Sequence, residues 1–133
     1  MGMDIYGIDP VSKEGEYFRS NVWGWRPVHM ICELMNRTHN LKVDMSKWGF
    51  NDGHGLKTQE DCDRLAEALD DFIKNDLGPG GTFQINVPEG RRMPEALIMK
   101  ALGYKDKEKY SIQKEHLLEF VRFLRSCGGF EID

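Results

Sequence analysis

Apolar residues surround most of the helix that the sequence predicts after Ser111. Ser111 is a typical N-cap residue, and the polar residues that follow it form only a narrow stripe. The apolar positions of this segment are Leu117, Leu118, Phe120, Val121, Phe123, Leu124 and Cys127. A helix that is apolar on several sides must be covered on several sides. We therefore expect this helix to be the central element, with the rest of the chain packed around it.

Two further helices are predicted from apolar stripes with helical spacing. The first begins at Pro27, because a proline lacks only an N–H that has no helical partner at that position. His29 and Glu33 lie opposite its stripe, so we expect an exposed pair. The second helix follows the N-cap residue Thr58 and ends at Gly78. The two stripes are Val28, Ile31, Cys32 and Met35, then Cys62, Leu65, Ala66, Leu69, Phe72 and Ile73.

Short strands are predicted near both ends of the chain and in its second half. Residues 4–8 and 82–87 have strand-like patterns, and residues 128–132 combine a helix stop at the two glycines with an alternating strand. Residues 94–102 are predicted to form a short helix. A chain of 133 residues is long enough for one hydrophobic core but not for two. We therefore predict an α+β fold, with residues 1–133 as a single domain. Three main helices would pack on a small sheet in which both terminal strands take part.

Composition and cysteine spacing indicate a cytoplasmic protein. Aromatic residues make up 11% of the chain, which argues against disorder, and no apolar run is long enough to cross a membrane. The first residues lack the basic start and apolar stretch of a signal peptide. Cys32, Cys62 and Cys127 form no closely spaced pair, and each falls on an apolar helix face. We expect three free thiols in a reduced core.

Charge is distributed unevenly along the chain. The formal net charge is −4, which excludes a generally polycationic nucleic-acid binder. Residues 60–76 contain seven acidic and two basic residues, whereas residues 91–114 contain seven basic and three acidic ones. The favoured interpretation is two solvated faces that neutralise each other within the fold. The alternative is a basic patch that docks on an acidic partner or a phosphate backbone. We expect weak nucleic-acid binding or none at physiological salt.

The turn formed by Asn51, Asp52, Gly53 and His54 is the best candidate for a chemical site. Its glycine spacing is not that of a phosphate-binding loop, and acidic residues crowd the start of the following helix. A metal would need a distant ligand such as His39 or Asp44, because nothing local supplies a third one. A structural turn with Gly53 at positive φ explains the pattern without a metal. The sequence thus predicts no catalytic residue, no metal and no cofactor.

The segment from Tyr17 to Arg26 is unusually rich in aromatic and arginine side chains. Tyr, Trp and Arg dominate the energetics of protein interfaces, so this segment is the second candidate for a binding surface. The binding residues would be Tyr17, Arg19, Trp23, Trp25 and Arg26. The alternative, which we favour, is that these aromatic residues form a lid over a small core, punctuated by a chain turn.

The same segments carry a resemblance to a known family. The motifs are MGMDIYG at residues 1–7, GEYFRSNVWGWRP at residues 15–27, NDGHGL at residues 51–56 and FLRSCGGFEI at residues 123–132. They resemble a family of small uncharacterised proteins from phages, prophages and bacteria. Some members of that family carry cysteine pairs in the middle of the chain. This sequence has none between Leu77 and Lys114, so a zinc knuckle is not implied. The resemblance implies a phage-like setting in bacterial cytoplasm.

Two hypotheses for function follow from these patterns. The favoured one is a non-enzymatic, phage-like accessory protein that binds a host or phage macromolecule, with a protein as the expected partner. The alternative is a small enzyme or metal-binding protein with its site at residues 51–54. A cleft that joins Asp52 and His54 to another titratable group would favour the enzyme. A flat aromatic or basic surface would favour the binding protein.

Overall fold

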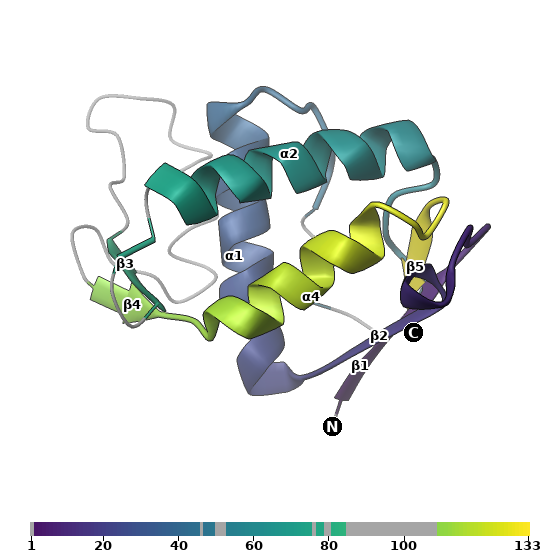
Figure 1. The fold of residues 1–133 in the computed structure, drawn as a ribbon, viewed down its shortest axis with the longest axis horizontal. Helices are drawn as coiled ribbons and strands as arrows, with labels where there is room; N and C mark the ends of the chain where they lie inside the picture. The colour runs from purple at the N-terminus through teal and green to yellow at the C-terminus, as the bar shows by residue number, and fades with distance from the viewer. Residues whose placement is uncertain (1, 46, 50–52, 76, 79–80, 85–108) are drawn as a thin grey trace.

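The protein has an α+β fold, as the sequence predicts (Figure 1). The computed structural model describes residues 2–45, 47–49, 53–75, 77–78, 81–84 and 109–133. Helices and strands follow one another in these residues as β1 (Gly2–Gly7), the short 3-10 helix η1 (Lys13–Gly15), β2 (Tyr17–Asn21), α1 (Val22–Thr38), α2 (Gln59–Asn75), β3 (Thr82–Gln84), β4 (Lys109–Ser111), α4 (Lys114–Leu124) and β5 (Phe130–Ile132). The predicted helix at residues 94–102 and the end of the predicted strand at residues 82–87 lie outside the described residues.

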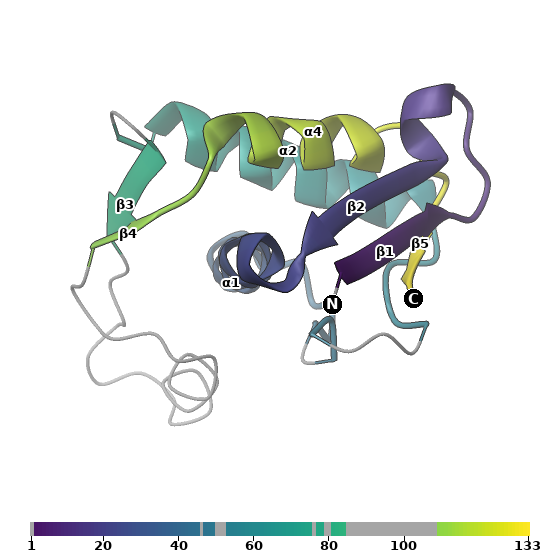
Figure 2. The same cartoon turned by 90° about the horizontal axis from the view of Figure 1, so that it is seen from below.

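Both ends of the chain lie in one antiparallel sheet with the strand order β2-β1-β5 (Figure 2). Ile5 of β1 pairs with Phe18 of β2 on one side and with Ile132 of β5 on the other. The N–H of Asp133 donates to the carbonyl oxygen of Asp4 at 2.7 Å. The prediction that the terminal strands meet in one sheet is therefore confirmed. Strands β3 and β4 form a separate antiparallel pair.

Residues 53–56 cover the second edge of β5. Gly53 donates its N–H to the carbonyl oxygen of Ile132 at 2.8 Å, and Ile132 donates back to His54 at 2.8 Å. Phe130 likewise donates to Leu56 at 2.6 Å. Strand β5 thus has hydrogen-bonding partners on both sides. Within the part of the chain that the structure describes, this leaves β2 as the outer edge of the sheet.

Phe120 on α4 lies at the centre of the core. It is fully buried, and its ring centroid lies 5.2 Å from that of Phe18 on β2 and 5.4 Å from that of Trp25 on α1. The ring of Phe130 on β5 lies 6.1 Å away. Helix α4 also packs lengthwise against α2. The prediction that the last helix is the central one is confirmed.

Two predicted helix starts are wrong. Helix α1 begins at Val22 rather than at Pro27, because the side chain of Asn21 accepts the N–H of Gly24 at 2.6 Å and caps the helix earlier. Pro27 is tolerated inside the helix, and the aromatic segment before it is a strand and a helical turn rather than a chain turn. Helix α4 begins after Gln113 without a side-chain cap, because Ser111 belongs to β4. Thr58 does cap α2, through the N–H of Asp61 at 3.2 Å.

Replacing Phe120 with alanine should lower the free energy of unfolding by about 3–5 kcal/mol, because it opens a cavity against side chains from three other elements. Urea denaturation followed by circular dichroism would measure this loss. The exposed neighbour Glu119 provides a control, since Glu119→Gln should change stability by less than about 0.5 kcal/mol. A Phe120→Ala variant as stable as the control would contradict the central position of α4.

Candidate binding surface on the outer face of the sheet

The two faces of the β1–β2 ladder differ in character. Met3, Ile5 and Phe18 point into the core and are buried, as expected from strict alternation along a strand. The other face carries Tyr6 of β1 directly opposite Tyr17 of β2. Their ring centroids lie 5.2 Å apart, yet the two residues are 46% and 44% exposed. The outer face of the sheet therefore presents a paired aromatic surface to solvent.

Charged groups surround this tyrosine pair. The Tyr17 hydroxyl donates a hydrogen bond to Oδ1 of Asp4, and this bond is the main reason why the pKa of Tyr17 is raised above its ordinary value. Nε of Arg19 lies 3.9 Å from the same carboxylate oxygen. Asp4 thus orients both a tyrosine and an arginine. On the neighbouring strand, Glu131 lies opposite Tyr6 and forms an ion pair of 3.3 Å with Lys57.

We use the name outer sheet face for the surface formed by Asp4, Tyr6, Tyr17, Arg19 and Glu131. Its ion pairs, together with Lys57, contain two acidic and two basic groups, so the surface has no excess of one charge. Such a surface offers aromatic contact area and directed hydrogen bonds rather than a strong electrostatic field.

The edge of β2 beside the outer sheet face has backbone groups that pair with none of the residues in the described part of the chain. The N–H of Gly7 donates to the carbonyl oxygen of Glu16 at 3.1 Å, and the register places Phe18 and Ser20 in the next hydrogen-bonded positions. The N–H and C=O groups of Tyr17 and Arg19 therefore point away from β1. They form no hydrogen bond with any residue that the structure describes. An edge of this kind is a template for pairing with another strand.

The large apolar side chains exposed in the described part of the chain all fall between residues 6 and 17. Besides the two tyrosines they are Ile8 and Val11, which is 79% exposed. The segment that carries them is held by backbone hydrogen bonds, since Ile8 donates to Gly129 at 2.8 Å and Val11 donates to Ser126 at 2.9 Å. The apolar side chains thus stand on a fixed backbone.

The predicted aromatic and arginine site is divided by the structure. Tyr17 and Arg19 lie together on the outer sheet face, as a binding role requires. Trp25 is only 2% exposed and donates its indole N–H to the carbonyl oxygen of Trp48 at 2.8 Å, so its assignment to a binding surface is wrong. Trp25 is part of the hydrophobic core, as the alternative prediction of a lid over the core expects.

The other predicted residues of this segment lie on α1. Arg26 is exposed, and the side chain of Trp23 lies outside what the structure describes. Asp4 and Tyr6 are not among the predicted binding residues, although their alternation with the buried residues Met3 and Ile5 of β1 is visible in the sequence.

The structure describes two residues of the predicted turn at residues 51–54, Gly53 and His54, and both have a structural role. Gly53 has a φ of 87°, which confirms the predicted positive φ, and the backbones of Gly53 and His54 pair with β5. Asn51 and Asp52 lie outside the described residues. Among the described residues, no group of three or more His, Cys, Asp or Glu side chains could hold a metal ion.

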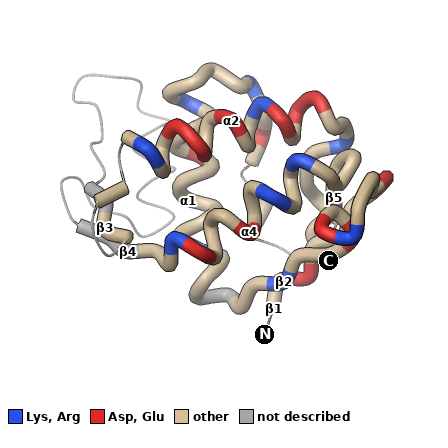
Figure 3. The backbone as a smooth tube through the Cα atoms, in the orientation of Figure 1, with Lys and Arg blue, Asp and Glu red and all other residues tan. Residues whose placement is uncertain are grey.

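Acidic residues recur along α2 (Figure 3), and two of them have ion-pair partners among the described residues. Asp70 pairs with Arg125, and Asp71 lies 3.5 Å from Nε2 of His39. Residues 91–108 lie outside the described residues, so the interpretation that they neutralise α2 is not addressed. Asp70 and Asp71 therefore already have local partners.

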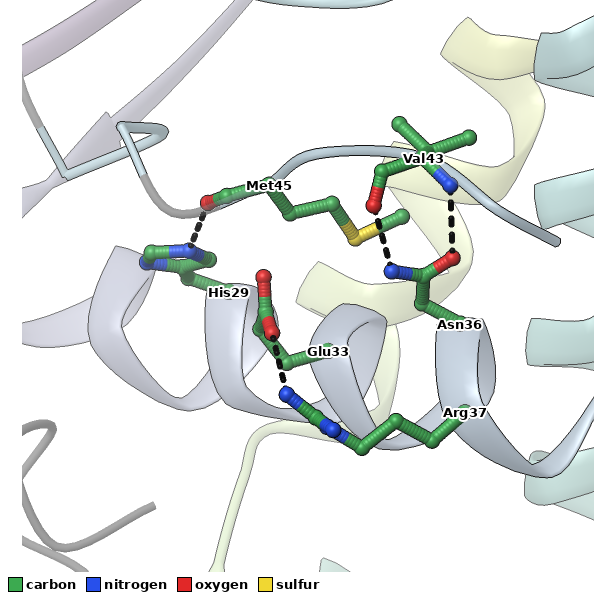
Figure 4. Close-up of polar contacts among 6 residues, drawn as sticks. All are labelled: His29, Glu33, Asn36, Arg37, Val43 and Met45. Carbon is green, nitrogen blue, oxygen red and sulfur yellow. Dashed lines mark hydrogen bonds and ion pairs between the residues drawn. The ribbon is translucent and has the colours of Figure 1, made fainter. Parts of the chain in front are cut away.

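A buried polar cluster lies between α1 and the segment that follows it (Figure 4). The ring of His29 is 4% exposed, and its Nε2 donates to the carbonyl oxygen of Met45 at 2.7 Å. Glu33 is equally buried and lies 3.8 Å from Nη2 of Arg37. The prediction that His29 and Glu33 form an exposed pair is therefore wrong. Residues 41–45 and 47–48 cover the face that the helical pattern assigns to solvent.

Asn36 fastens this covering segment to α1. Its Nδ2 donates to the carbonyl oxygen of Val43 at 2.6 Å, and its Oδ1 accepts the N–H of Val43 at 3.1 Å (Figure 4). Asn40 and Lys42 adopt positive φ angles of 53° and 61°, which reverse the chain immediately after the helix. The cluster thus holds a loop in place.

Burial shifts the two titratable groups of this cluster in opposite senses. Desolvation lowers the pKa of His29 below its ordinary value of 6.5, although the hydrogen bond with Met45 opposes the shift. Desolvation raises the pKa of Glu33, with Arg37 opposing and Asp44 adding to the effect. Both shifts favour the neutral form. A neutral imidazole with its proton on Nε2 matches the contact with a carbonyl oxygen, which can only accept.

The contribution of His29 to the free energy of unfolding should therefore fall as the pH drops below about 6.5, because the unfolded chain then binds a proton at His29 that the folded chain does not. Burial also lowers the pKa of His116, so His116 changes the free energy of unfolding with pH in the same direction as His29. Glu33 has the opposite effect above its ordinary pKa of 4.5, because its pKa is raised in the folded chain. The free energy of unfolding, measured by urea denaturation between pH 7.5 and 5, should change less steeply with pH in His29→Gln than in wild type. The difference between the two slopes should be at most about 1.4 kcal/mol per pH unit. Equal slopes would contradict a neutral buried His29.

Comparisons of the chain with protein-family models, curated proteins and solved structures find no match. None of the described helices is long and apolar enough to cross a membrane. Function must therefore be argued from the geometry of this chain.

Proposed function

We propose that this chain is a non-enzymatic binding protein that recognises an extended segment of a partner protein along strand β2 and the outer sheet face. The observation that carries the proposal is the coincidence of an exposed Tyr6–Tyr17 pair with an unpaired sheet edge. The resemblance to phage and prophage proteins suggests the setting, a bacterial cell in which the partner is a host or phage protein.

The backbone of β2 supplies the first part of the recognition. Tyr17 and Arg19 offer two N–H and two C=O groups that face away from β1, with the spacing that an added strand requires. Each new main-chain hydrogen bond contributes about 0.5–1.5 kcal/mol. These bonds do not depend on the sequence of the bound segment, so they support affinity rather than specificity.

The side chains of the outer sheet face supply the second part. A segment paired with β2 places alternate side chains on this face, next to Tyr17 and Arg19. The Tyr17 ring favours an apolar or aromatic neighbour, and the guanidinium of Arg19, whose side chain is 67% exposed, favours a carboxylate. Ile8 and Val11 extend the apolar surface beyond the strand. The preferred partner segment is therefore extended, apolar and acidic at alternating positions.

Nucleic acid and small-molecule chemistry are the weaker alternatives. The outer sheet face carries as many acidic as basic groups, which gives no phosphate-binding surface. An enzyme or metal site at residues 51–54 remains the alternative hypothesis, and it would need Asn51 or Asp52 to complete it. The backbone pairing of Gly53 and His54 with β5 favours a structural turn.

A proline at position 19 tests the edge directly. Arg19→Pro removes one outward N–H but no hydrogen bond to β1, so the sheet should remain intact. Arg19→Ala keeps that N–H and removes only the side chain. Partner proteins captured from infected and uninfected bacterial lysates would be purified, and their affinity measured by isothermal titration calorimetry. We expect Arg19→Pro to weaken binding about tenfold more than Arg19→Ala, the equivalent of about 1.4 kcal/mol.

Two further variants keep the test decisive if Arg19→Pro is unstable. Tyr17→Ala should weaken binding because it removes half of the exposed aromatic pair, whereas Glu67→Ala on the exposed side of α2 should not. Wild-type affinity in both Tyr17→Ala and Arg19→Pro would overturn the proposal. A wild-type chain that elutes as a dimer, with Arg19→Pro as a monomer, would assign the edge to a second copy and contradict a foreign partner.

A further inference from the structure

Two of the three cysteines meet in the core. Sγ of Cys62 on α2 lies 3.6 Å from Sγ of Cys127 in the turn after α4, although 65 positions separate them in the sequence. Both side chains are fully buried, and all three cysteines are free thiols, as predicted. A disulfide bond has a length of about 2.05 Å, so the sulfur atoms are in contact and about 1.5 Å from bonding distance.

The backbone around Cys127 is held at several points. The side chain of Gln59, at the start of α2, accepts the N–H of Gly128 at 2.6 Å and donates to the carbonyl oxygen of Leu124 at 2.8 Å. Cys62 lies one turn further along α2. These contacts fix the turn against the helix that carries the second sulfur, so the two thiols stay opposed.

The two thiols share one hydrogen bond, with Cys127 as the donor and Cys62 as the acceptor. The Cys127 thiol also lies 3.5 Å from the carbonyl oxygen of Leu124, a second acceptor for its proton. Burial opposes thiolate formation at both cysteines, whereas the N–H of Gly129 favours it at both. Because the two sulfur atoms are in contact, either one can be the thiolate when the pair loses a proton.

We infer that Cys62 and Cys127 form a redox modification site, at which hydrogen peroxide converts the paired thiols into a reversible disulfide bond. The thiolate of one of the two cysteines attacks one peroxide oxygen, the O–O bond breaks, and the released hydroxide takes up a proton to become water. The resulting sulfenic acid is attacked by the sulfur of the other cysteine. The S–S bond forms, the thiol proton of the second cysteine and the hydroxyl of the sulfenic acid leave as a second water, and peroxide has accepted two electrons.

Burial determines which oxidants can act and how fast. Neither sulfur is exposed, so a large disulfide reagent is excluded in the folded state, whereas peroxide is nearly as small as water. Entry requires only a local opening of the turn at residues 125–129, and openings of this size cost less than global unfolding. We therefore expect oxidation to be slower than that of an exposed thiol.

Cys32 is the internal control for this site. It lies on α1, is equally buried, and its pKa is raised by burial and by the neighbouring charge of Glu33. No other cysteine sulfur is placed against it among the described residues. It should therefore remain a thiol under conditions that oxidise the pair.

The native protein should be treated with hydrogen peroxide, quenched with catalase, denatured and titrated with a thiol reagent. We expect three thiols to fall to one, with a mass lower by two hydrogen atoms, and dithiothreitol to restore all three. Peptide mapping should place the linkage between Cys62 and Cys127. The Cys32→Ala variant should fall from two thiols to none with the same linkage, whereas Cys62→Ala should form no intramolecular disulfide.

Three free thiols after peroxide treatment of the native chain would overturn the inference, as would oxidation to sulfinic acid without a linkage. A disulfide that includes Cys32, or one that forms only between molecules, would do the same. Because wild type and Cys32→Ala decide the question, a failure of Cys62→Ala to fold leaves the test intact. None of these results depends on the outcome of the binding experiments.

Discussion

The contact of Phe120 with aromatic rings from β2, α1 and β5 is the constraint on which the fold depends. These elements come from both ends of the chain, and the Phe120 ring joins the sheet that contains β2 and β5 to α1 and α4. Burying one large ring among them fixes the side of the sheet that faces α4. The opposite side then has no helix to cover it in the described structure, so the outer sheet face is a direct consequence of how the core is filled.

Periodicity along the chain predicted the elements that pack through their own stripes. Most of the buried positions of α2 and α4 are those that helical spacing indicates, and the terminal strands pair as expected. The exceptions are Ile73 and Leu118, which are only partly buried, and Ala68, which is buried outside the predicted stripe. For His29 and Glu33, helical spacing predicts exposure, but both residues are buried. A second segment, fastened by Asn36, lies over the side of α1 that spacing assigns to solvent. The spacing of apolar residues within one helix cannot predict that a later segment of the chain packs over its polar face.

In the aromatic segment at residues 17–26, composition alone likewise does not predict which side chains are exposed. Tyr17 and Trp25 stand eight positions apart and have the same interface-forming character, yet one is exposed and the other is in the core. The difference arises at Asn21, where the strand gives way to the helix and the direction of successive side chains changes from alternating to spiralling. Composition could indicate that the segment is important, but only the boundary between the two elements decides which residues can touch a partner.

The pairing of β1 with β5 also affects how the chain folds during its synthesis. Strand β1 can pair with β2 soon after both are synthesised, but its second partner, β5, is synthesised only after α1, α2 and α4. During that interval Phe18 and Trp25 have no Phe120 to pack against. Contacts between such distant positions also form slowly. The sheet and the core around Phe120 are therefore incomplete in the nascent protein until α4 and β5 have been synthesised.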